Sequence, residues 1–379
     1  MANMLNKLNI ITTAAFPWRT GTAILALYRA YYLSQKGLDV RLYIPWVPPP
    51  EQKKLFGKDI TFESYKAQEE CIRFYLPHSG GSSLQLEFYP GIYIEALGSI
   101  LPRCALSRRI RQCDWLILEE PEHLNWLHPW NRFRKKATRI TGIMLTNYTF
   151  YIKEALPYLP MIPNLVNRYN RWLIRRHCDD AILLGNTFPY LTEAQMIHSS
   201  GIHPSFFETS SQMPYSKNAY FIGKLIWEKG FRELIDLLSI SEIKDLDVFG
   251  VGKDQKAINA YAGARGVRLH FKGLSSDPPH DLKNYKIFIN TSRSDTICST
   301  TAEALGQGKF VIIPTIPGND AFYRFKNCLT YSSSQEFLGR LRYAMENQPV
   351  NDSQLKSLSW EAAVDRLLQY YENTKNQLM

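Results

Sequence analysis

Apolar residues along the N-terminal half of the chain fall into short runs separated by polar or amphipathic segments. Five of these runs have the length of buried strands, and they lie at 8–15, 40–46, 114–118, 140–145 and 181–184. Between the first two runs, the segment 23–35 carries apolar residues at helical spacing. Strands that alternate with helices are typical of a parallel sheet covered by helices on both faces.

The same alternation starts again after a polar stretch at 209–217. Strands are predicted at 219–223, 246–250, 267–271, 287–290 and 310–314, with helices at 230–238, up to 262 and at 298–305. We therefore expect an α/β protein with two doubly wound, Rossmann-like domains, spanning 1–213 and 217–355, that face each other across a cleft. In open sheets of this kind, ligands bind beyond the carboxyl ends of the strands.

A separate amphipathic segment ends the chain. Ser359 is a favourable helix N-cap residue. The apolar side chains that follow at helical spacing are Trp360, Val364, Leu367, Leu368 and Tyr371. We predict a helix within 356–379 that either completes the second domain or crosses back to the first.

The composition is that of a globular protein, with 45% apolar and 21% charged residues, which excludes extensive disorder. The chain has 379 residues and a formal net charge of +10. Before Tyr215 there are 24 basic and 17 acidic residues, whereas the remainder holds 21 and 18. The excess of positive charge in the N-terminal half indicates an anionic partner there, such as a membrane surface, a nucleic acid or a phosphorylated substrate.

Cysteine spacing and hydropathy argue against several other classes. The six cysteines form no CxxC pair or regular framework, so we expect reduced thiols, no metal site and no cofactor. The first 16 residues are too polar for a secretory signal, no transit peptide is visible, and no run of about 18 apolar residues predicts a transmembrane helix. We expect a protein on the cytoplasmic face of a membrane, bound peripherally.

The second half carries residues suited to a diphosphate. Gly223 and Lys224 end a predicted strand, and Lys229 and Gly230 begin the next predicted helix. Two lysines and helix-start amides at the carboxyl end of a strand favour anion binding. An ordinary solvated helix start is the alternative. Gly250 belongs to a Gly-x-Gly turn after the following strand, which by itself is a weak signal.

An acidic pair comes later in the same half. Asp295 lies in the loop before the helix predicted at 298–305, and Glu303 lies about one turn inside it. An acid here can accept hydrogen bonds from vicinal hydroxyls, as an acidic residue does on the ribose in dinucleotide-binding folds. Helix-start amides can hold phosphate oxygens. The amides expected to do so are those of Ser299, Thr300 and Thr301.

The lysine pair, the glycine turn and the acidic pair, in this order, resemble the nucleotide-sugar half of GT-B glycosyltransferases of retaining family 4. Over nearly the whole chain, longer motifs resemble plant-type digalactosyldiacylglycerol synthases. These motifs are TTAAFPWRTGTA (12–23), EEPEHLNW (119–126), TNY (146–148), YFIGKLIWEKG (220–230), DVFG (247–250), the segment 294–305 and NCLTY (327–331). The resemblance implies a GT-B fold whose last helix returns to the first domain.

The resemblance also implies an activity. It is the transfer of galactose from UDP-galactose to monogalactosyldiacylglycerol, with retention of the anomeric configuration. Gly223, Lys224, Lys229 and the amides near Ser299 would hold the diphosphate. No carboxylate identifies itself as a nucleophile, so we favour front-face attack in which Lys224 and Lys229 stabilise the leaving diphosphate.

The same resemblance assigns the sugar-binding residues. Glu303 would bind the ribose and Asp295 the transferred sugar, while Gly21 would approach the donor phosphate or the acceptor from the other domain. One position departs from the family, because plant-type sequences tend to have histidine where this chain has Leu145. His123, in an acid-rich run after a strand, is a candidate for proton transfer near neutral pH, and the alternative is a loop hydrogen bond.

Basic residues with aromatic neighbours form a second candidate surface. No acid occurs between Ala155 and Cys178, and arginines there alternate with Leu165, Tyr169 and Trp172. This composition suits an anionic lipid interface, and an ordinary surface helix is the alternative. The residues we expect to contact the membrane are Arg134, Lys135, Lys136, Arg168, Arg171, Trp172 and Arg175. Arg176 falls on the apolar side of the predicted helix.

Nucleic acid is not expected, since no recognised binding module is present.

These expectations define a membrane-associated glycosyltransferase with a UDP-sugar donor and a glycolipid acceptor. One alternative is a family-4 relative that uses another sugar donor or acceptor, including UDP-glucose. The other is a catalytically silent GT-B module that binds glycolipid, for which Leu145 is the one favourable feature.

Overall fold

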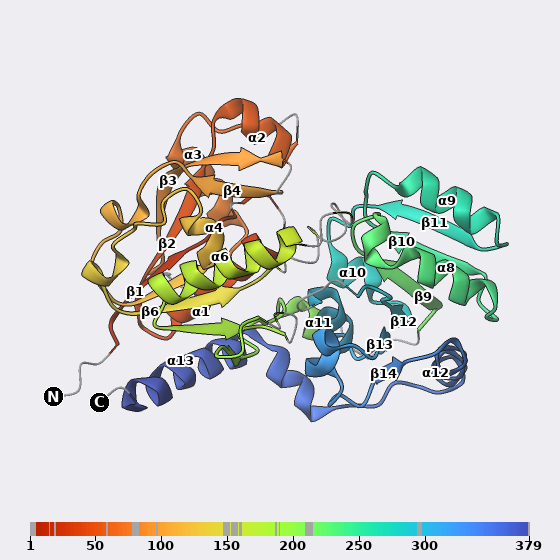
Figure 1. Cartoon of the computed structure of the whole chain (residues 1–379). Coiled ribbons are helices and arrows are strands. Elements are labelled where there is room, and N and C mark those ends of the chain that lie inside the picture. The colour runs from red at the N-terminus through yellow and green to blue at the C-terminus, as the bar shows by residue number, and fades with distance from the viewer. Residues whose placement is uncertain are drawn as a thin grey trace. The chain divides into compact units, whose positions relative to one another are not determined.

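The computed structural model describes residues 5–14, 16–18, 20–57, 60–77, 83–95, 98–146, 152, 158, 161–185, 188, 190–208, 215–293 and 298–377. The chain forms two compact units (Figure 1). Unit 1 comprises Met1–Leu184, Phe188–Ser199 and Val364–Met379, and unit 2 comprises Gly185–Thr187 and Ser200–Ala363.

The sheet of unit 1 contains eight strands among the described residues, in the order β4-β3-β2-β1-β5-β6-β7-β8. They are β1 (Lys7–Ile11), β2 (Asp39–Trp46), β3 (Gln85–Ile94), β4 (Ser99–Pro102), β5 (Cys113–Glu119), β6 (Ala137–Met144), β7 (Asp180–Leu183) and β8 (Gln195–Met196). Neighbouring strands are parallel except β3 and β4, which pair antiparallel.

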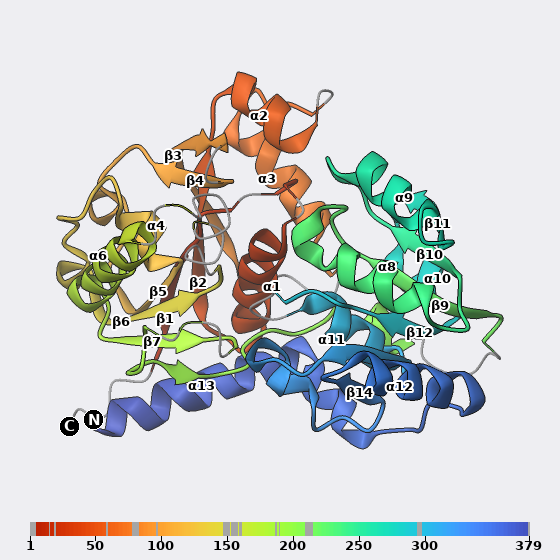
Figure 2. The same cartoon turned by 45° about the vertical axis from the view of Figure 1, so that its right-hand side comes forward.

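Helices cover both faces of this sheet. They are α1 (Gly21–Gln35), α2 (Pro49–Phe56), α3 (Tyr65–Phe74), α4 (Pro121–Asn125) and α6 (Met161–His177). The helices α1 and α6 lie on opposite sides of the strands (Figure 2). Thr20 caps α1, since its hydroxyl accepts a hydrogen bond from the Ala23 amide at 3.3 Å.

The sheet of unit 2 contains six strands among its described residues, all parallel, in the order β11-β10-β9-β12-β13-β14. They are β9 (Lys217–Ile222), β10 (Asp245–Phe249), β11 (Arg268–Gly273), β12 (Tyr285–Ile289), β13 (Phe310–Pro314) and β14 (Cys328–Tyr331). The helices are α7 (Ser205–Glu208), α8 (Phe231–Ser239), α9 (Gln255–Gly263), α10 (Pro278–Leu282), α11 (Ser299–Gly306) and α12 (Ser334–Glu346).

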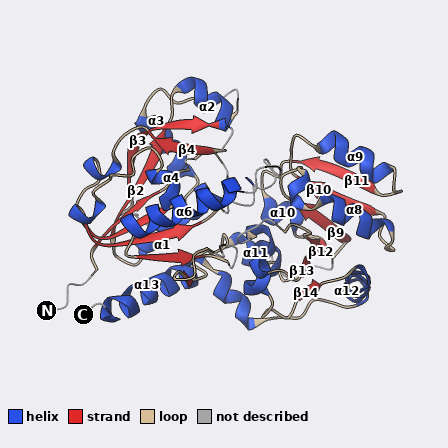
Figure 3. Cartoon of the chain, viewed as in Figure 1, coloured by secondary structure: helices blue, strands red, loops and turns tan. Residues whose placement is uncertain are grey.

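The central strands β12 and β13 of unit 2 are buried on both faces. In β12, Ile287 and Ile289 join a core cluster with residues of α8, α9 and α12, whereas Phe288 joins a second cluster with residues of α10 and α11. Alternate side chains of this strand thus enter two cores, and Figure 3 shows β12 among the helices of the unit. This explains why these strands appear in the sequence as continuous apolar runs.

The last helix, α13 (Trp360–Gln377), begins in unit 2, and its remainder belongs to unit 1. Ser359 caps it, with its Oγ accepting from the Ala362 amide at 3.2 Å. On unit 1, the Tyr370 hydroxyl donates to Asp180 at 2.8 Å, and Arg139 donates to the Tyr371 carbonyl at 3.2 Å. The predicted return of this helix to the first part of the chain is confirmed.

The predicted α/β class with two parallel-dominated sheets is also confirmed. The sequence pattern did not predict β3, β4 and β14, nor the helices α2, α3 and α12. In β3, most residues are only partly buried, so the run has neither a continuous apolar character nor a clean alternation.

Candidate functional site

The donor-site residues predicted in the second half lie where the strands of unit 2 end. Gly223 and Lys224 follow β9, Gly250 follows β10, and Glu303 lies in α11, the helix after β12. In a parallel sheet these strand ends meet at one edge, which is where ligands bind in doubly wound folds.

Glycines let the backbone segments at this edge come into contact. Gly250 has a φ of +130°, and a Cβ there would lie 1.9 Å from the Gly223 carbonyl oxygen. A Cβ on Gly252 would lie 2.2 Å from the Leu225 carbonyl oxygen. The Gly-x-Gly turn at 250–252 is therefore required for close packing of the loop after β10 on the loop after β9.

Gly230 lies against the segment that follows β12, the third strand that ends at this edge. Its φ is +79°, and a Cβ would lie 2.3 Å from the Thr291 carbonyl oxygen. The Thr291 hydroxyl donates to the Gly230 carbonyl at 2.9 Å. Gly230 also precedes the first residue of α8, so the start of this helix is held against the segment that follows β12.

Backbone amides at three of the predicted donor-binding positions already donate to carbonyls within the protein. The Gly223 amide donates to the Phe249 carbonyl at 3.0 Å, and the Gly250 amide donates to the Gly273 carbonyl at 2.7 Å. The Thr301 amide donates to the Cys298 carbonyl at 3.1 Å. The physical reason is that these residues already pair within the sheet edge and the first turn of α11.

The amides of Ser299 and Thr300 differ from these three. Neither has a backbone acceptor among the described residues, as is usual for the first positions of a helix. The N-terminus of α11 therefore keeps two donors available for an anion.

The two lysines of the edge interact electrostatically. The pKa of Lys224 is lowered, first by desolvation and then by the positive charge of Lys229. Lys224 forms no ion pair with any acid in the described ranges. Two neighbouring ammonium groups attract an anion, since an anion would relieve their repulsion.

Glu303 is the acid available at this edge. Desolvation raises the pKa of its carboxyl to about 7. Its side chain makes no hydrogen bond or ion pair with the residues that the structure describes, so both carboxylate oxygens can accept from a ligand. Asp295, its predicted partner, lies outside the described residues, and its role stays a prediction.

Gly21 and His123 belong to unit 1. Gly21 is the exposed first residue of α1, and a Cβ there would meet no atom within 4 Å. His123 is fully buried in α4, where Nδ1 lies 2.8 Å from the Ser99 Oγ. Burial lowers the pKa of His123 to about 4. The imidazole is thus neutral at pH 7, which corrects the expectation of a group that titrates near neutrality.

Next to His123 lies a carboxyl group in an apolar setting. Glu122 is fully buried, and neither of its carboxyl oxygens has a hydrogen-bond partner in the described part of the chain. Burial raises its pKa to about 8, and the charge of Glu120 adds to the shift. Glu122 therefore remains protonated at neutral pH.

The sequence analysis did not single out Glu120 as a candidate site residue. Its φ of +58° is left-handed, and its carboxylate accepts hydrogen bonds from the hydroxyls of Thr13 and, at 2.6 Å, Thr146. Three of the motifs that carry the family resemblance thus meet at one carboxylate. A strained backbone at such a position is frequent at functional sites. Leu145, beside Thr146, is buried.

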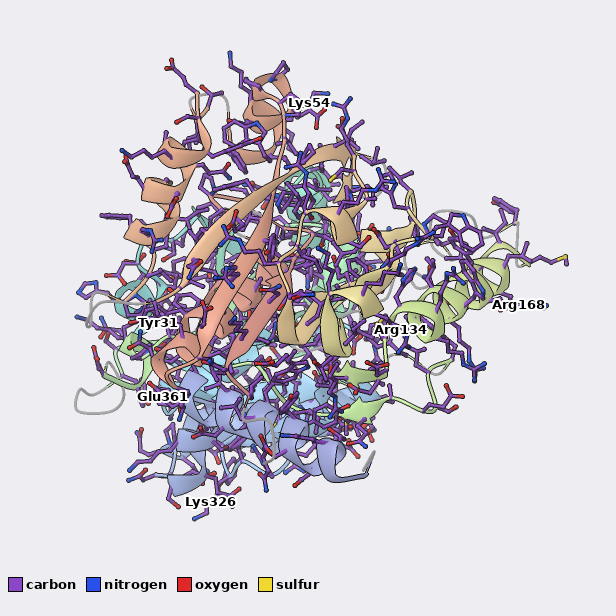
Figure 4. All side chains as sticks on the ribbon, turned by 90° about the vertical axis from the view of Figure 1, so that its left-hand side faces the viewer. Tyr31, Lys54, Arg134, Arg168, Lys326 and Glu361 are labelled. Atoms are coloured by element: carbon purple, nitrogen blue, oxygen red, sulfur yellow. The ribbon has the colours of Figure 1, made fainter. Side chains whose placement is uncertain are left out.

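Of the basic residues predicted to face a membrane, Arg168, Arg171 and Arg175 belong to α6. Figure 4 labels Arg168 on this helix and Arg134 on a neighbouring segment. Several of these basic residues form surface ion pairs. Arg134 pairs with Asp179, and both Arg171, at 3.0 Å, and Arg175 pair with Glu193. The cations with no acidic partner among the described residues are Lys135, Lys136 and Arg168.

One face of α6 exposes apolar side chains. The exposed fractions are 73% for Met161, 59% for Leu165 and 40% for Trp172. The Arg176 guanidinium lies 4.4 Å from the ring centroid of Trp130 and 5.6 Å from that of Trp172. This cation–π contact is the reason that Arg176 falls on the apolar side of the helix.

The described ranges contain no helix that is both long and apolar enough to cross a membrane. They also contain no group of three or more His, Cys, Asp or Glu side chains that could hold a metal ion.

The chain is similar in sequence to plant proteins. It is 36% identical over 382 residues to digalactosyldiacylglycerol synthase 2 of Glycine max, covering 95% of this chain and 82% of that protein. The chain belongs to the digalactosyldiacylglycerol synthase family. Digalactosyldiacylglycerol synthase 1 of Glycine max is 39% identical over 384 residues, which cover 96% of this chain. The chain spans about half the length of such synthase 1 relatives, with 49% of that protein covered.

Solved structures agree with this family assignment at the level of the fold. Sucrose-phosphate synthase from Thermosynechococcus elongatus matches with a TM-score of 0.63 at 12% identity, covering 98% of this chain and all of that one (100%). Anabaena HepE, solved with UDP-glucose, matches with a TM-score of 0.62 at 13% identity, covering 98% and 99%. This family member therefore has the GT-B fold that the sequence motifs implied. No family model matches the chain.

Proposed function

We propose that this chain transfers galactose from UDP-galactose to monogalactosyldiacylglycerol and so forms digalactosyldiacylglycerol. The observation that carries the proposal is the 36% identity to a digalactosyldiacylglycerol synthase over 82% of that protein's length. In the reaction, the bond from the anomeric carbon to the diphosphate breaks and a glycosidic bond to the acceptor hydroxyl forms. The proton of that hydroxyl passes to the leaving diphosphate or to solvent.

The carboxyl edge of the unit 2 sheet supports a UDP-sugar donor. Lys224 and Lys229 supply positive charge for the diphosphate. The amides of Ser299 and Thr300, which have no backbone acceptor among the described residues, donate to its oxygens. The Glu303 carboxylate accepts from the ribose hydroxyls. HepE, whose fold this chain shares, was solved with UDP-glucose, and a UDP-sugar is the donor chemistry that these residues suit.

The residues at this edge support catalysis by charge stabilisation. The leaving diphosphate gains negative charge as the anomeric bond breaks, and the two lysines stabilise that charge where it develops. Front-face attack, in which the diphosphate itself takes the acceptor proton, retains the anomeric configuration without a protein nucleophile. Asp295 is proposed to hold the transferred sugar. The neutral imidazole of His123, buried against Ser99, is proposed only to position α4.

The acceptor is a lipid, so the enzyme must meet a membrane surface. We infer that the apolar face of α6, with Leu165 and Trp172 exposed, enters the interface while Lys135, Lys136 and Arg168 contact anionic lipid. Surface ion pairs such as that of Arg171 with Glu193 are weak, and they can exchange for lipid phosphates. The relatives are named chloroplastic, which is consistent with a galactolipid membrane.

The test is a transfer assay with the purified chain, labelled UDP-galactose and monogalactosyldiacylglycerol in mixed micelles, run beside UDP-glucose. Labelled digalactosyl lipid is the expected product, and its anomeric configuration is read by NMR. Transfer from UDP-glucose alone, or to another acceptor, would replace this proposal with a different family-4 activity. UDP binding without any turnover would identify a silent module, the alternative that Leu145 favours.

A further inference from the structure

Unit 1 contains a cavity of about 670 Å³ that no step of the proposed reaction uses. Its walls come from two segments that are distant in sequence, one around Ser107 and one at 127–136. The lining residues are Ala105, Ser107, Arg108, Leu127, His128, Pro129, Trp130, Asn131, Arg132, Lys135 and Lys136. Four of them are basic and none is acidic.

The two segments are held in a fixed relation. The Ser107 amide donates to the Asn131 Oδ1 at 3.2 Å, and the Asn131 Nδ2 donates to the Asn125 Oδ1 at 3.0 Å. Leu106, two positions before Arg108, and Phe133, directly after Arg132, are fully buried in the core of unit 1. The backbone positions of the basic residues are therefore set before any ligand binds, which lowers the entropic cost of binding.

The four cations have no counter-ion in the described part of the chain. Arg108, Arg132, Lys135 and Lys136 form no ion pair there, whereas their neighbour Arg134 pairs with Asp179. Cations that gather around one concave surface repel one another, and an anion inside would remove that repulsion. A terminal phosphate carries close to two negative charges and three acceptor oxygens, which guanidinium groups bind in a bidentate manner.

The rim of the cavity is apolar and exposed. Leu127 and Trp130 line the cavity with exposed fractions of 53% and 69%. The Trp130 ring lies 6.1 Å from that of Trp172 on α6, so this rim continues into the apolar face of that helix. A soluble phosphate needs no such rim, whereas a lipid headgroup brings acyl chains to it.

We propose that this cavity binds the terminal phosphate of an anionic phospholipid headgroup, at a site separate from the sugar-transfer site. The inference rests on the proposed action of the chain at a membrane surface, which it deepens by naming the lipid that is recognised. Diffuse attraction to negative charge depends on surface potential alone. A discrete cavity instead distinguishes headgroups at equal potential.

The experiment measures binding of the full chain to phosphatidylcholine vesicles that contain phosphatidic acid or phosphatidylglycerol, adjusted to equal zeta potential. The pocket variant is Arg108→Gln with Arg132→Gln. The matched control is Lys53→Gln with Lys66→Gln, which removes two exposed cations elsewhere in unit 1. We expect the parent to prefer phosphatidic acid and the control to stay within twofold of it. The pocket variant should lose the preference and bind roughly 30-fold more weakly.

Equal binding of the parent to both vesicles, or equal losses in the pocket and control variants, would overturn the proposal. Competition by glycerol 3-phosphate tests whether the ligand is a soluble phosphate rather than a lipid headgroup. Competition only at millimolar concentrations fits a lipid site, whereas binding as tight as that of the vesicles would show that a soluble phosphate is the ligand. Unchanged thermal unfolding of the exposed-arginine variants confirms that they fold.

A transfer assay in neutral detergent micelles separates this inference from the proposed function. The pocket variant should transfer galactose at the parent rate there, because no phospholipid is present. If the parent shows the headgroup preference but no transfer, the proposed function fails and the cavity assignment stands. If transfer is intact but the preference is absent, only the cavity assignment fails.

Discussion

The guanidinium of Arg29 forms an ion pair with the Glu119 carboxylate, and both side chains are completely excluded from solvent. Arg29 lies in α1 and Glu119 is the last residue of β5, so the pair joins two elements that are distant in sequence. Arg29 also donates to the Ser199 carbonyl at 3.1 Å. Burial lowers the pKa of Arg29 to about 9, which leaves it charged at neutral pH.

Removal of this arginine should destabilise the protein strongly. Arg29→Met leaves the Glu119 carboxylate buried without its partner, and we expect a loss of about 3–5 kcal/mol in the free energy of unfolding. The double variant Arg29→Met with Glu119→Leu should recover most of it. Urea unfolding followed by tryptophan fluorescence measures both. Arg73→Met is the control, because its exposed pair with Glu69 should contribute at most about 0.5 kcal/mol, and equal losses at both sites would contradict the prediction.

Glu122 should make stability depend on pH. Its pKa is raised from 4.5 to about 8, so between these values the folded protein keeps a proton that the unfolded chain has released. The contribution of the protonated group is complete below about pH 4.5 and is lost as the pH rises through about 8. Relative to the parent, Glu122→Gln should therefore gain stability as the pH rises from 5 to 8. Thermal unfolding at several pH values measures this gain, and the exposed Glu63→Gln variant should show none.

Glu303 should make the affinity for the donor increase as the pH rises. In the proposed donor complex the ribose hydroxyls donate to the ionised Glu303 carboxylate. The pKa of this group is about 7, so UDP affinity should fall as the pH is lowered through 7. At pH 8, Glu303→Gln should weaken UDP binding about ten- to a hundredfold. The variant should also lose the part of the pH dependence that belongs to this carboxyl. Calorimetric titration at pH 6 and 8 gives both results, and parent-like affinity of the variant would exclude the ribose assignment.

Lys229 should distinguish the two phosphates of the donor. Its proposed partner is the second phosphate, so Lys229→Ala should weaken UDP binding about ten- to a hundredfold and UMP binding much less. The exposed Lys256→Ala in α9 changes the net charge equally and should alter neither affinity. A parallel loss for UMP would place the lysine elsewhere on the donor.

The apolar face of α6 should govern membrane binding together with its basic neighbours. Binding to anionic vesicles should weaken as salt rises, because exposed charges are screened over about 8–10 Å at physiological ionic strength. Trp172→Ser should weaken binding at every salt concentration, since it removes apolar area from the interface. Phe74→Ser, on the exposed face of α3, is the control and should bind as the parent does. Co-sedimentation measures these effects, and equal binding to neutral and anionic vesicles at all salt concentrations would exclude the electrostatic contribution.

Local patterns were enough to predict most of the framework. The apolar runs of β1 and β9 and the cap at Ser359 depend on neighbours within a few residues, so spacing alone indicates them. The order of Gly223, Lys224 and Glu303 along successive strand–helix units likewise placed the donor residues at one sheet edge, because parallel strands all end on the same side.

Only the tertiary structure decided what those residues can do. The Gly223 and Gly250 amides donate to carbonyls of neighbouring segments, which the sequence pattern did not indicate. Burial of His123 lowers the pKa of its imidazole to about 4. Arg132 forms a cavity with Arg108, 24 positions away, because the Ser107–Asn131 hydrogen bond brings their segments together. Periodicity is a property of adjacent residues, whereas burial, pKa and the availability of a donor depend on partners that folding brings from elsewhere in the chain.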